Sequence, residues 1–311
     1  MKTMIETRGL CKAHGPTQVL AGVDLAVGQG EIFALLGPNG AGKTTTVNIL
    51  STLLRPDSGT ARVGGFDVAG QGAAVRSVIS LTGQYAAVDG FQTGAENLMM
   101  MCRLGHLGQG AARNRTRELL ERFDLQDAAR RQVSTYSGGM RRRLDLAISL
   151  INNPPIIFLD EPTTGLDPNS RTQMWTVVKE LAGGGSTILL TTQYLEEADQ
   201  LADQVAVLDG GRIVAQGTPA GLKAGLDGEH VELAFASRDA YGRARALLPG
   251  FSTHDDDALT LRYPTRNSAA TLRELLQVSE AHALDVANLS IIKPTLDDVF
   301  LAITTSKVSA A

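Results

Sequence analysis

The feature that most constrains this chain is a glycine-rich segment between an apolar stretch and a predicted helix. Residues 31–36, EIFALL, have the composition of a buried strand, and a helix is predicted from about Lys43 to Leu54. The connection fits G-x-x-x-x-G-K-[ST], in which backbone N–H groups surround phosphate oxygens at a helix N-terminus. It consists of Gly37, Pro38, Asn39, Gly40, Ala41, Gly42, Lys43 and Thr44. Lys43 would supply charge to the β- and γ-phosphates and Thr44 a ligand for Mg²⁺, so the chain is predicted to bind a nucleoside triphosphate.

A second apolar stretch ends in two neighbouring carboxylates. Residues 156–159, IIFL, are followed directly by Asp160 and Glu161. Side chains alternate along a strand, so the two acids point in different directions and can take different roles. Asp160 is predicted to hold Mg²⁺ through its water shell, and Glu161 to orient or deprotonate an attacking water.

A third segment, YSGGMRRR, opens a predicted helix that runs to Leu150. Ser137 is suited to cap this helix, and Gly138 and Gly139 would let a ligand approach the exposed N–H groups, which makes a second anion site. One chain cannot easily bring both sites to the same triphosphate, because each belongs to its own structural unit. The sequence therefore predicts a head-to-tail pair of chains, in which each Ser-Gly-Gly segment closes over the nucleotide held by the other.

The rest of the chain indicates an α/β fold followed by a smaller α+β unit. Strands predicted at 156–159, 187–191 and 204–208 alternate with helical stretches, which favours a mostly parallel sheet covered on both faces. A helical pattern occupies residues 94–131. After Pro219 a new series begins, with strands predicted at 230–235, 258–263 and 285–292, and helices at 238–248, 267–282 and near 295–302.

Composition excludes some classes of protein. The net charge of −4 provides no general attraction to nucleic acid or anionic lipid, and Cys11 and Cys102 match no metal spacing. The start MKTMIETRGL lacks the apolar core of a signal peptide, and no segment approaches the ~20 apolar residues of a membrane-spanning helix. We therefore expect a cytosolic protein whose membrane role depends on a partner. Residues 103–143 carry ten arginines and four acids, typical of a solvated helical surface or of one facing a permease or lipid headgroups.

Together these motifs resemble the ATP-binding subunit of an ABC transporter over residues 4–218. GPNGAGKTT, which ends at Thr45, resembles the Walker A loop, YSGGM the signature sequence and IIFLDE the Walker B strand. By this resemblance Asp167, in TGLD, would cross the dimer interface. Gln84, in LTGQYAAVDG, would touch Mg²⁺ and link the site to a helical subdomain at about 85–150. The implied fold is a P-loop ABC-type nucleotide-binding domain with a helical subdomain, plus the small C-terminal α+β domain.

A narrower resemblance is to exporter ATPases of the daunorubicin/doxorubicin-resistance type, through GQYAAVD, TTQYLEEAD and PTLDDVF. It implies ATP and Mg²⁺ as cofactors, a second copy of the chain, and a separate membrane permease contacted near residues 85–131. The protein would then lie on the cytoplasmic side of the cell membrane and power efflux of a small amphipathic, drug-type compound. Residues 1–218 would form the ATP-binding domain, and 219–311 an accessory or regulatory domain or a packing appendage without a ligand of its own.

Two positions depart from the family pattern. His14 stands where an aromatic residue usually stacks on adenine, and imidazole offers less area, so GTP as well as ATP is a possible nucleotide. Gln193 replaces a histidine that contacts the γ-phosphate and holds the catalytic glutamate. Glutamine can donate to phosphate but cannot titrate near neutral pH. Because Glu161 is present as the base, we expect Gln193 to act by geometry, with slow but genuine hydrolysis.

Two other classes of function compete with the exporter. A soluble ABC ATPase acting on ribosomes or DNA usually has tandem sites or long coiled-coil insertions, and this chain has neither, nor a basic nucleic-acid footprint. An ATP-binding switch that dimerises but scarcely hydrolyses is kept open by Gln193. The cargo cannot be read from the sequence, because cargo contacts would lie on the permease.

Overall fold

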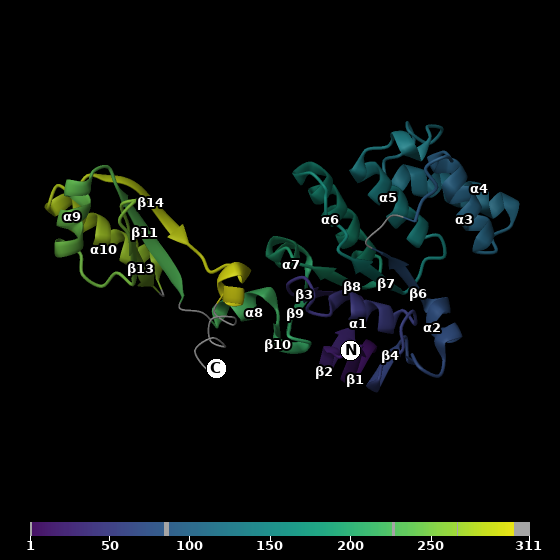
Figure 1. Cartoon of the computed structure of the whole chain (residues 1–311). Helices are drawn as coiled ribbons and strands as arrows, with labels where there is room; N and C mark the ends of the chain where they lie inside the picture. The colour runs from purple at the N-terminus through teal and green to yellow at the C-terminus, as the bar shows by residue number, and fades with distance from the viewer. Residues whose placement is uncertain (1, 84–86, 226–227, 266, 302–311) are drawn as a thin grey trace. The chain divides into compact units, whose positions relative to one another are not determined.

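The computed structural model describes residues 2–83, 87–225, 228–265 and 267–301, in two compact units, 1–219 and 220–311 (Figure 1). A central six-stranded sheet forms the middle of the first unit. Its strands, in spatial order, are β10 (Arg212–Gly217), β9 (Gln204–Asp209), β3 (Ile32–Leu36), β8 (Thr187–Thr192), β7 (Ile156–Asp160) and β6 (Ile79–Thr82). All neighbours are parallel except β10 and β9. Every residue of β3, β7 and β8 is buried, which explains their continuous apolar runs.

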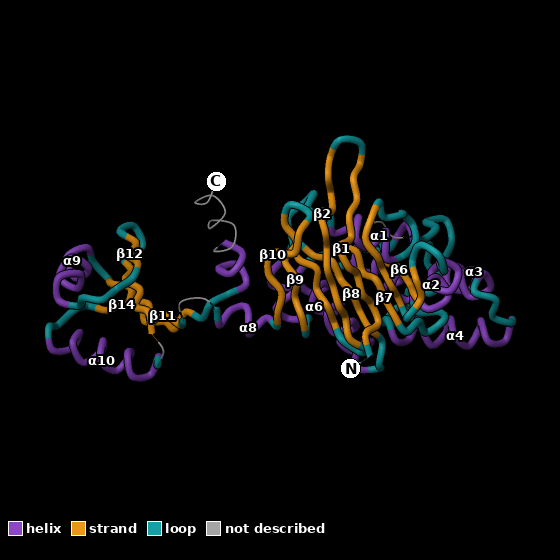
Figure 2. The backbone as a smooth tube through the Cα atoms, turned by 90° about the horizontal axis from the view of Figure 1, so that it is seen from below, coloured by secondary structure: helices purple, strands orange, loops and turns teal. Residues whose placement is uncertain are grey.

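A second, antiparallel sheet packs against this centre (Figure 2). Its order is β2 (Thr17–Gly28), β1 (Thr3–His14), β4 (Ser58–Val63) and β5 (Phe66–Asp67). Helix α1 (Lys43–Leu50) buries Val47, Ile49 and Leu50 in one apolar core with side chains from both sheets. The helix ends earlier than the predicted Leu54, because the chain turns at Thr52 with φ of 68°. The P-loop helix is thereby fixed between the two sheets.

The remaining helices of this unit form two groups. α2 (Gly72–Val78), α3 (Gly94–Leu104), α4 (Gln109–Arg122), the 3₁₀ turn η1 (Val133–Thr135) and α5 (Gly138–Ser149) lie between β5 and β7 in the chain, whereas α6 (Pro168–Gly183) and α7 (Leu195–Leu201) follow β7 and β8. In Figure 1, α6 and α7 lie on the opposite side of the central sheet from α1. The helical pattern predicted over 94–131 is divided, because the chain reverses after α3 through His106 with φ of 63°. The predicted mostly parallel α/β sheet covered on both faces is confirmed.

The C-terminal unit is a small antiparallel α+β fold. After α8 (Pro219–Ala224), the elements are β11 (Glu229–Phe235), α9 (Arg238–Leu247), β12 (Thr253–Asp255), β13 (Thr260–Thr265), α10 (Ser268–Ala281) and β14 (Val286–Ile292), then a short helix at 296–301. The strand order β12-β13-β11-β14 is that of a βαββαβ ferredoxin-like unit. Alternate residues Val231, Leu233 and Phe235 join the apolar core with α9 and α10. Glu232, which alternates with them, forms an ion pair with Arg262 of 2.6 Å. In the described part of the chain, no helix is long and apolar enough to cross a membrane.

Candidate active site

The loop between β3 and α1 has a backbone that only glycine accommodates at three points. Gly40 and Gly42 have φ of 81° and 107°, which strain residues with a Cβ. A Cβ on Gly37 would lie 2.3 Å from the carbonyl oxygen of Leu208 in β9. The glycines of the motif are therefore required by the fold itself, and they bring the loop to the carboxyl edge of the parallel sheet, where such sheets bind ligands.

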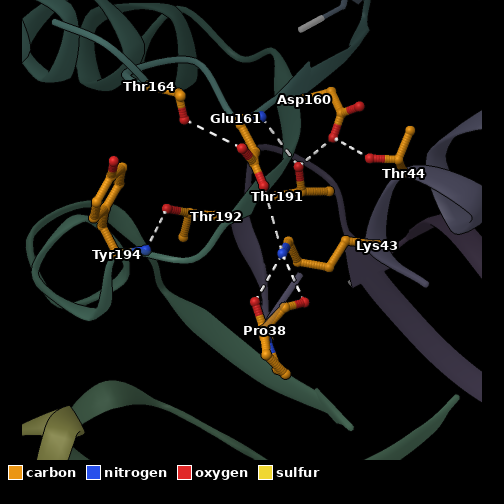
Figure 3. Close-up of polar contacts among 10 residues, drawn as sticks. Pro38, Lys43, Thr44, Asp160, Glu161, Thr164, Thr191, Thr192 and Tyr194 are labelled. Carbon is orange, nitrogen blue, oxygen red and sulfur yellow. Dashed lines mark hydrogen bonds and ion pairs between the residues drawn. The ribbon is translucent and has the colours of Figure 1, made fainter. Parts of the chain in front are cut away.

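Lys43 begins α1 with its amine turned into this loop (Figure 3). Its side chain is only 4% exposed. The Nζ donates to the carbonyl oxygens of Gly37 at 2.7 Å and Pro38 at 3.2 Å, and it forms an ion pair with Glu161 Oε1 at 3.5 Å. Because Glu161 is one of three partners of this amine, an incoming phosphate would compete with Glu161 for the same charge.

Asp160, the last residue of β7, joins the two predicted halves of the site. Its Oδ1 accepts hydrogen bonds from Thr44 Oγ1 at 3.3 Å and from Thr191 Oγ1 at 2.5 Å. Thr191 lies on the neighbouring strand β8 and is fully buried. A carboxylate and a hydroxyl this close together are hard oxygen donors of the kind that Mg²⁺ prefers, so Thr44 and Asp160 fit that ion.

Glu161 follows the strand end with φ of 49°, a left-handed conformation that is uncommon outside glycine. Its N–H donates to the carbonyl and hydroxyl oxygens of Thr191, both at 3.1 Å. Its carboxylate faces Lys43 on one oxygen and accepts from Thr164 Oγ1 at 3.2 Å on the other. The two neighbouring carboxylates therefore have separate partners: that of Asp160 accepts from the hydroxyls of Thr44 and Thr191, and that of Glu161 contacts Lys43 and Thr164.

The Ser-Gly-Gly segment and Asp167 occupy the starts of two other helices. Ser137 caps α5 by accepting from the N–H of Met140 at 3.2 Å, and both Ser137 and Gly138 are exposed. Asp167 caps α6 by accepting from Ser170 N at 3.0 Å and Oγ at 2.6 Å, and these bonds hold the pKa of its carboxyl below the ordinary value. A Cβ on Gly139 would lie 2.5 Å from Ser170 Oγ, so the two helix starts are in contact.

Four of the predicted residues form no hydrogen bond or ion pair with this cluster in the described part of the chain. His14 is exposed at the end of β1, where it pairs with Thr17 across the hairpin. Asn39 is exposed on the loop, and Thr45 is half-buried in the first turn of α1. Gln193 is half-buried directly after β8. Gln84 lies outside the described residues, and Ala41 is buried at 6% exposure.

Arg142, on α5, is a residue of the site that sequence reasoning missed. Its buried guanidinium donates to the carbonyl oxygens of Asp160 at 3.1 Å and Glu161 at 3.3 Å. It also forms an ion pair with Asp145, one turn along the helix, at 3.4 Å. Burial lowers the pKa of Arg142 and raises that of Asp145, while each charge opposes the shift of the other. The three consecutive arginines 141–143 were a signal that one would face inward, but not which one.

Glu197, on α7, is a second buried acid that was not predicted. It is fully buried, and its Oε1 accepts from Trp175 Nε1 at 3.2 Å. Burial raises the pKa of its carboxyl, and the hydrogen bond from Trp175 opposes this shift. The side chain thus links α7 with α6.

Comparisons with known proteins agree with this geometry. Residues 20–164 match the family model described as ABC transporter. The chain is 49% identical over 303 residues to the daunorubicin resistance ATP-binding protein DrrA3 of Streptomyces coeruleorubidus, covering 97% of this chain and 96% of that protein. It is 44% identical over 311 residues to the doxorubicin resistance ATP-binding protein DrrA of Mycobacterium tuberculosis, covering 97% and 93%.

A solved structure resembles the first unit. It is a dimeric post-hydrolysis state of the ATP-binding cassette MJ0796 bound to ADP and Pi, with a TM-score of 0.63 and 25% identity, covering 69% of this chain and 98% of that one. The fold predicted from the motifs is therefore confirmed as that of an ATP-binding cassette. The chain belongs to the ABC transporter family, as an ATP-binding and ATP-hydrolysing protein of the daunorubicin/doxorubicin-resistance type.

Proposed function

We propose that two copies of this chain bind ATP head-to-tail and use its hydrolysis to drive export of a small amphipathic, drug-type compound through a separate membrane permease. The observation that carries the proposal is the convergence of Lys43, Thr44, Asp160 and Glu161 at one edge of the parallel sheet. These residues supply a phosphate-binding charge, two hard oxygen donors and a carboxylate that has no bond to either donor. That set is what hydrolysis of a phosphoanhydride by water requires.

Each side chain has a task that follows from its contacts. The loop N–H groups and Lys43 bind the phosphates, and Thr44 and Asp160 would hold Mg²⁺, which neutralises charge on the phosphate oxygens when bound. Glu161 is released from Lys43 when phosphate takes the amine, and its carboxylate then orients or deprotonates the attacking water. Gln193, beside this edge after β8, donates a hydrogen bond to the γ-phosphate in place of the family histidine.

A second copy completes the site. Ser137 and Gly138 are exposed at the start of α5, and Asp167 is exposed at the start of α6. The N–H groups at the start of α5 are suited to anionic phosphate oxygens. Since Ser170 touches both segments, closure on the partner's nucleotide would involve the two helices together. His14 would stack on the base of the nucleotide.

The permease would dock on the helical side of this unit. A groove of about 380 Å³ lies among β6, α3 and α5, with apolar walls that include Leu81, Met101 and Ile148. Leu104, which also lines the groove, is a large apolar side chain that is 65% exposed. Exposed apolar patches of this kind mark interaction sites. A short amphipathic segment of the permease fits this groove, and would hold the chain on the cytoplasmic side of the cell membrane.

The type of compound exported and the role of the C-terminal unit are inferred from the relatives. The names of the relatives, daunorubicin and doxorubicin resistance, support a drug-type compound as the cargo. The match covers 97% of the chain, so it includes most of the ferredoxin-like unit as well as the ATP-binding unit. We assign that unit an accessory or regulatory role in the dimer.

The test is ATP turnover by the purified protein in Mg²⁺, comparing wild type with Glu161→Gln and Gln193→His. We expect Glu161→Gln to lower turnover by roughly 10²–10⁴-fold, the usual contribution of a general base, and Gln193→His to leave it equal or raise it. Wild-type turnover no faster than that of Glu161→Gln, with activity gained only in Gln193→His, would instead identify a nucleotide-gated switch.

A further inference from the structure

The groove assigned to the permease has a charged residue in its wall that faces Arg142. Asp145 lines the groove together with Ala87, yet its side chain is only 5% exposed. Its Oδ1 accepts a hydrogen bond from the N–H of Ala87 at 2.9 Å, and its Oδ2 faces Arg142 Nη1 at 3.4 Å. A buried carboxylate costs free energy unless charged or hydrogen-bonding groups compensate for it. Asp145 therefore depends on both partners, one at the groove and one facing the site.

Arg142 extends this connection to the main-chain carbonyl groups of Asp160 and Glu161. Its Nη2 donates to Asp160 O and Glu161 O, and its Nε donates to Pro162 O at 2.9 Å. Its Nη1, besides facing Asp145, donates to Gly83 O at 2.6 Å. The planar guanidinium has donors in a fixed fork, so its direction is set by all these acceptors together. A shift of Asp145 therefore changes the set of acceptors that orients the guanidinium, which also bonds the main chain at Asp160 and Glu161.

We propose that Asp145 and Arg142 are positioning residues that form a relay from the permease groove to the catalytic carboxylates. A permease segment seated in the groove contacts Ala87 and Asp145, Asp145 orients Arg142, and Arg142 sets the main chain that carries Asp160 and Glu161. This inference rests on the proposed function, because it assumes a permease in the groove. It adds a route through α5, the helix that also begins with Ser137, so that docking and closure on the partner's nucleotide act on one rigid element.

The relay predicts which substitutions matter on α5. Arg142→Lys keeps the charge but replaces the forked guanidinium with a single amine, which cannot satisfy the same set of carbonyls. Arg143→Lys is the matched control, because Arg143 is the next residue and its ion-pair partner is the exposed Asp124 at 3.4 Å. Asp145→Asn is a milder second variant, since it keeps an oxygen for the Ala87 N–H and removes the charge that faces Arg142.

The experiment measures two quantities on each full-length variant: ATP turnover, and hydrogen exchange at the Ala87 amide in the nucleotide-free protein. For Arg142→Lys we expect turnover to fall on the order of tenfold or more, and exchange at Ala87 to accelerate by about tenfold, because Asp145 loses its partner. Asp145→Asn should change both quantities in the same direction but less. Arg143→Lys should leave both within about twofold of wild type.

Two results would overturn the relay. One is unchanged exchange at Ala87 in both Arg142→Lys and Asp145→Asn, which would mean that the residues are not coupled. The other is faster exchange throughout the N-terminal unit, with turnover lost in proportion, which would mean that Arg142 only holds the fold. A wild-type protein without turnover would contradict the proposed function instead, and the exchange data would still decide whether Arg142 controls the groove.

Discussion

The N-terminal and C-terminal units bury polar groups of different kinds. The described part of the first unit buries charged side chains, some of them at the ATP site: Lys43, Arg142, Asp145, Asp160 and Glu197. The described residues of the C-terminal unit include no buried charged side chain. Its buried small polar side chains are the hydroxyls of Thr260, Thr265 and Ser279. Burying charge costs free energy. The buried charges therefore lower the stability of the first unit, and the second unit has no such cost among its described residues. Equal substitutions in the two units should therefore separate effects on turnover from effects on stability.

The largest difference is expected within one strand of the first unit. Thr191→Val keeps the side-chain shape but removes the hydroxyl that donates to Asp160 and accepts from the Glu161 N–H. We expect turnover to fall by roughly 10–100-fold as both acids lose their position, and the free energy of unfolding to fall by about 1–3 kcal/mol. Steady-state turnover and denaturant unfolding measure the two quantities.

Thr187→Val is the control for this prediction. Thr187 lies on the same strand and is equally buried, and its hydroxyl accepts from the Gly30 N–H at 3.0 Å, away from the catalytic acids. It should lower the free energy of unfolding by a similar amount without a specific effect on turnover. Equal losses of turnover in the two variants would show that Thr191 contributes only to the stability of β8.

A smaller effect is expected from the charge on Glu197. Burial raises the pKa of this carboxyl above its ordinary value of 4.5, so the folded protein keeps a proton that the unfolded chain releases. Stability from this group is therefore fully present below pH 4.5 and is lost as pH rises through the folded pKa, at about 1.4 kcal/mol per pH unit within that window. Glu197→Gln has no such loss, so its advantage over wild type in the free energy of unfolding should grow as pH rises above 4.5.

Glu196→Gln tests whether this pH dependence comes from burial. Glu196 precedes Glu197 on α7, but its side chain is 69% exposed and faces Arg171 at 3.6 Å. Denaturant unfolding at a series of pH values should show wild-type behaviour for Glu196→Gln. A parallel change in both variants would contradict the assignment of the effect to the buried carboxyl.

The sequence predicted the parts of the site that depend on local pattern. The P-loop and the acids at the end of β7 are contiguous motifs, and each lies where the strand and helix periodicity placed it. Thr191 was included in a predicted strand, but its role depends on β8 lying beside β7, and strand order is a property of the whole sheet. The same holds for the C-terminal unit, whose β12 has only three residues and gave no pattern of its own.

The arginine-rich stretch, residues 103–143, shows the same limit of prediction from sequence. The arginine-rich stretch was interpreted as a solvated or partner-facing surface, and this was wrong for two of its members. Arg115 donates to the carbonyl oxygens of Leu150 and Ile151, and Arg142 to those behind the catalytic acids. Periodicity identifies the buried face of a helix from its apolar residues. An arginine faces inward only where distant segments of the chain supply hydrogen-bond acceptors for it. Those acceptors are known only once the fold is known.

The smallest effects are expected from removing the same kind of hydrogen bond, from a buried tyrosine hydroxyl to a carbonyl oxygen, in each of the two units. Tyr136 and Tyr263 are both 4% exposed, and each hydroxyl donates to a carbonyl oxygen, Ala128 O at 2.7 Å and Leu248 O at 2.8 Å. Replacing either by Phe should lower the free energy of unfolding of its own unit by about 1 kcal/mol. Only Tyr136→Phe should also lower turnover, by a few-fold, because Tyr136 directly precedes Ser137. A matching loss of turnover in Tyr263→Phe would show that the C-terminal unit acts on the ATP site.

Alkaline unfolding of Tyr263→Phe beside wild type tests the C-terminal hydrogen bond separately. Burial raises the pKa of Tyr263 from 10.0 to about 12, so between these values the unfolded chain loses a proton that the folded unit retains. The stability that this group contributes is fully present below pH 10 and is lost as pH rises toward 12. Tyr263→Phe lacks that group, so circular dichroism melts should show a shallower loss of stability over this window than in wild type. Equal slopes in the two proteins would mean that the buried hydroxyl of Tyr263 does not titrate with unfolding, and the contrast between the units would then rest on Tyr136 alone.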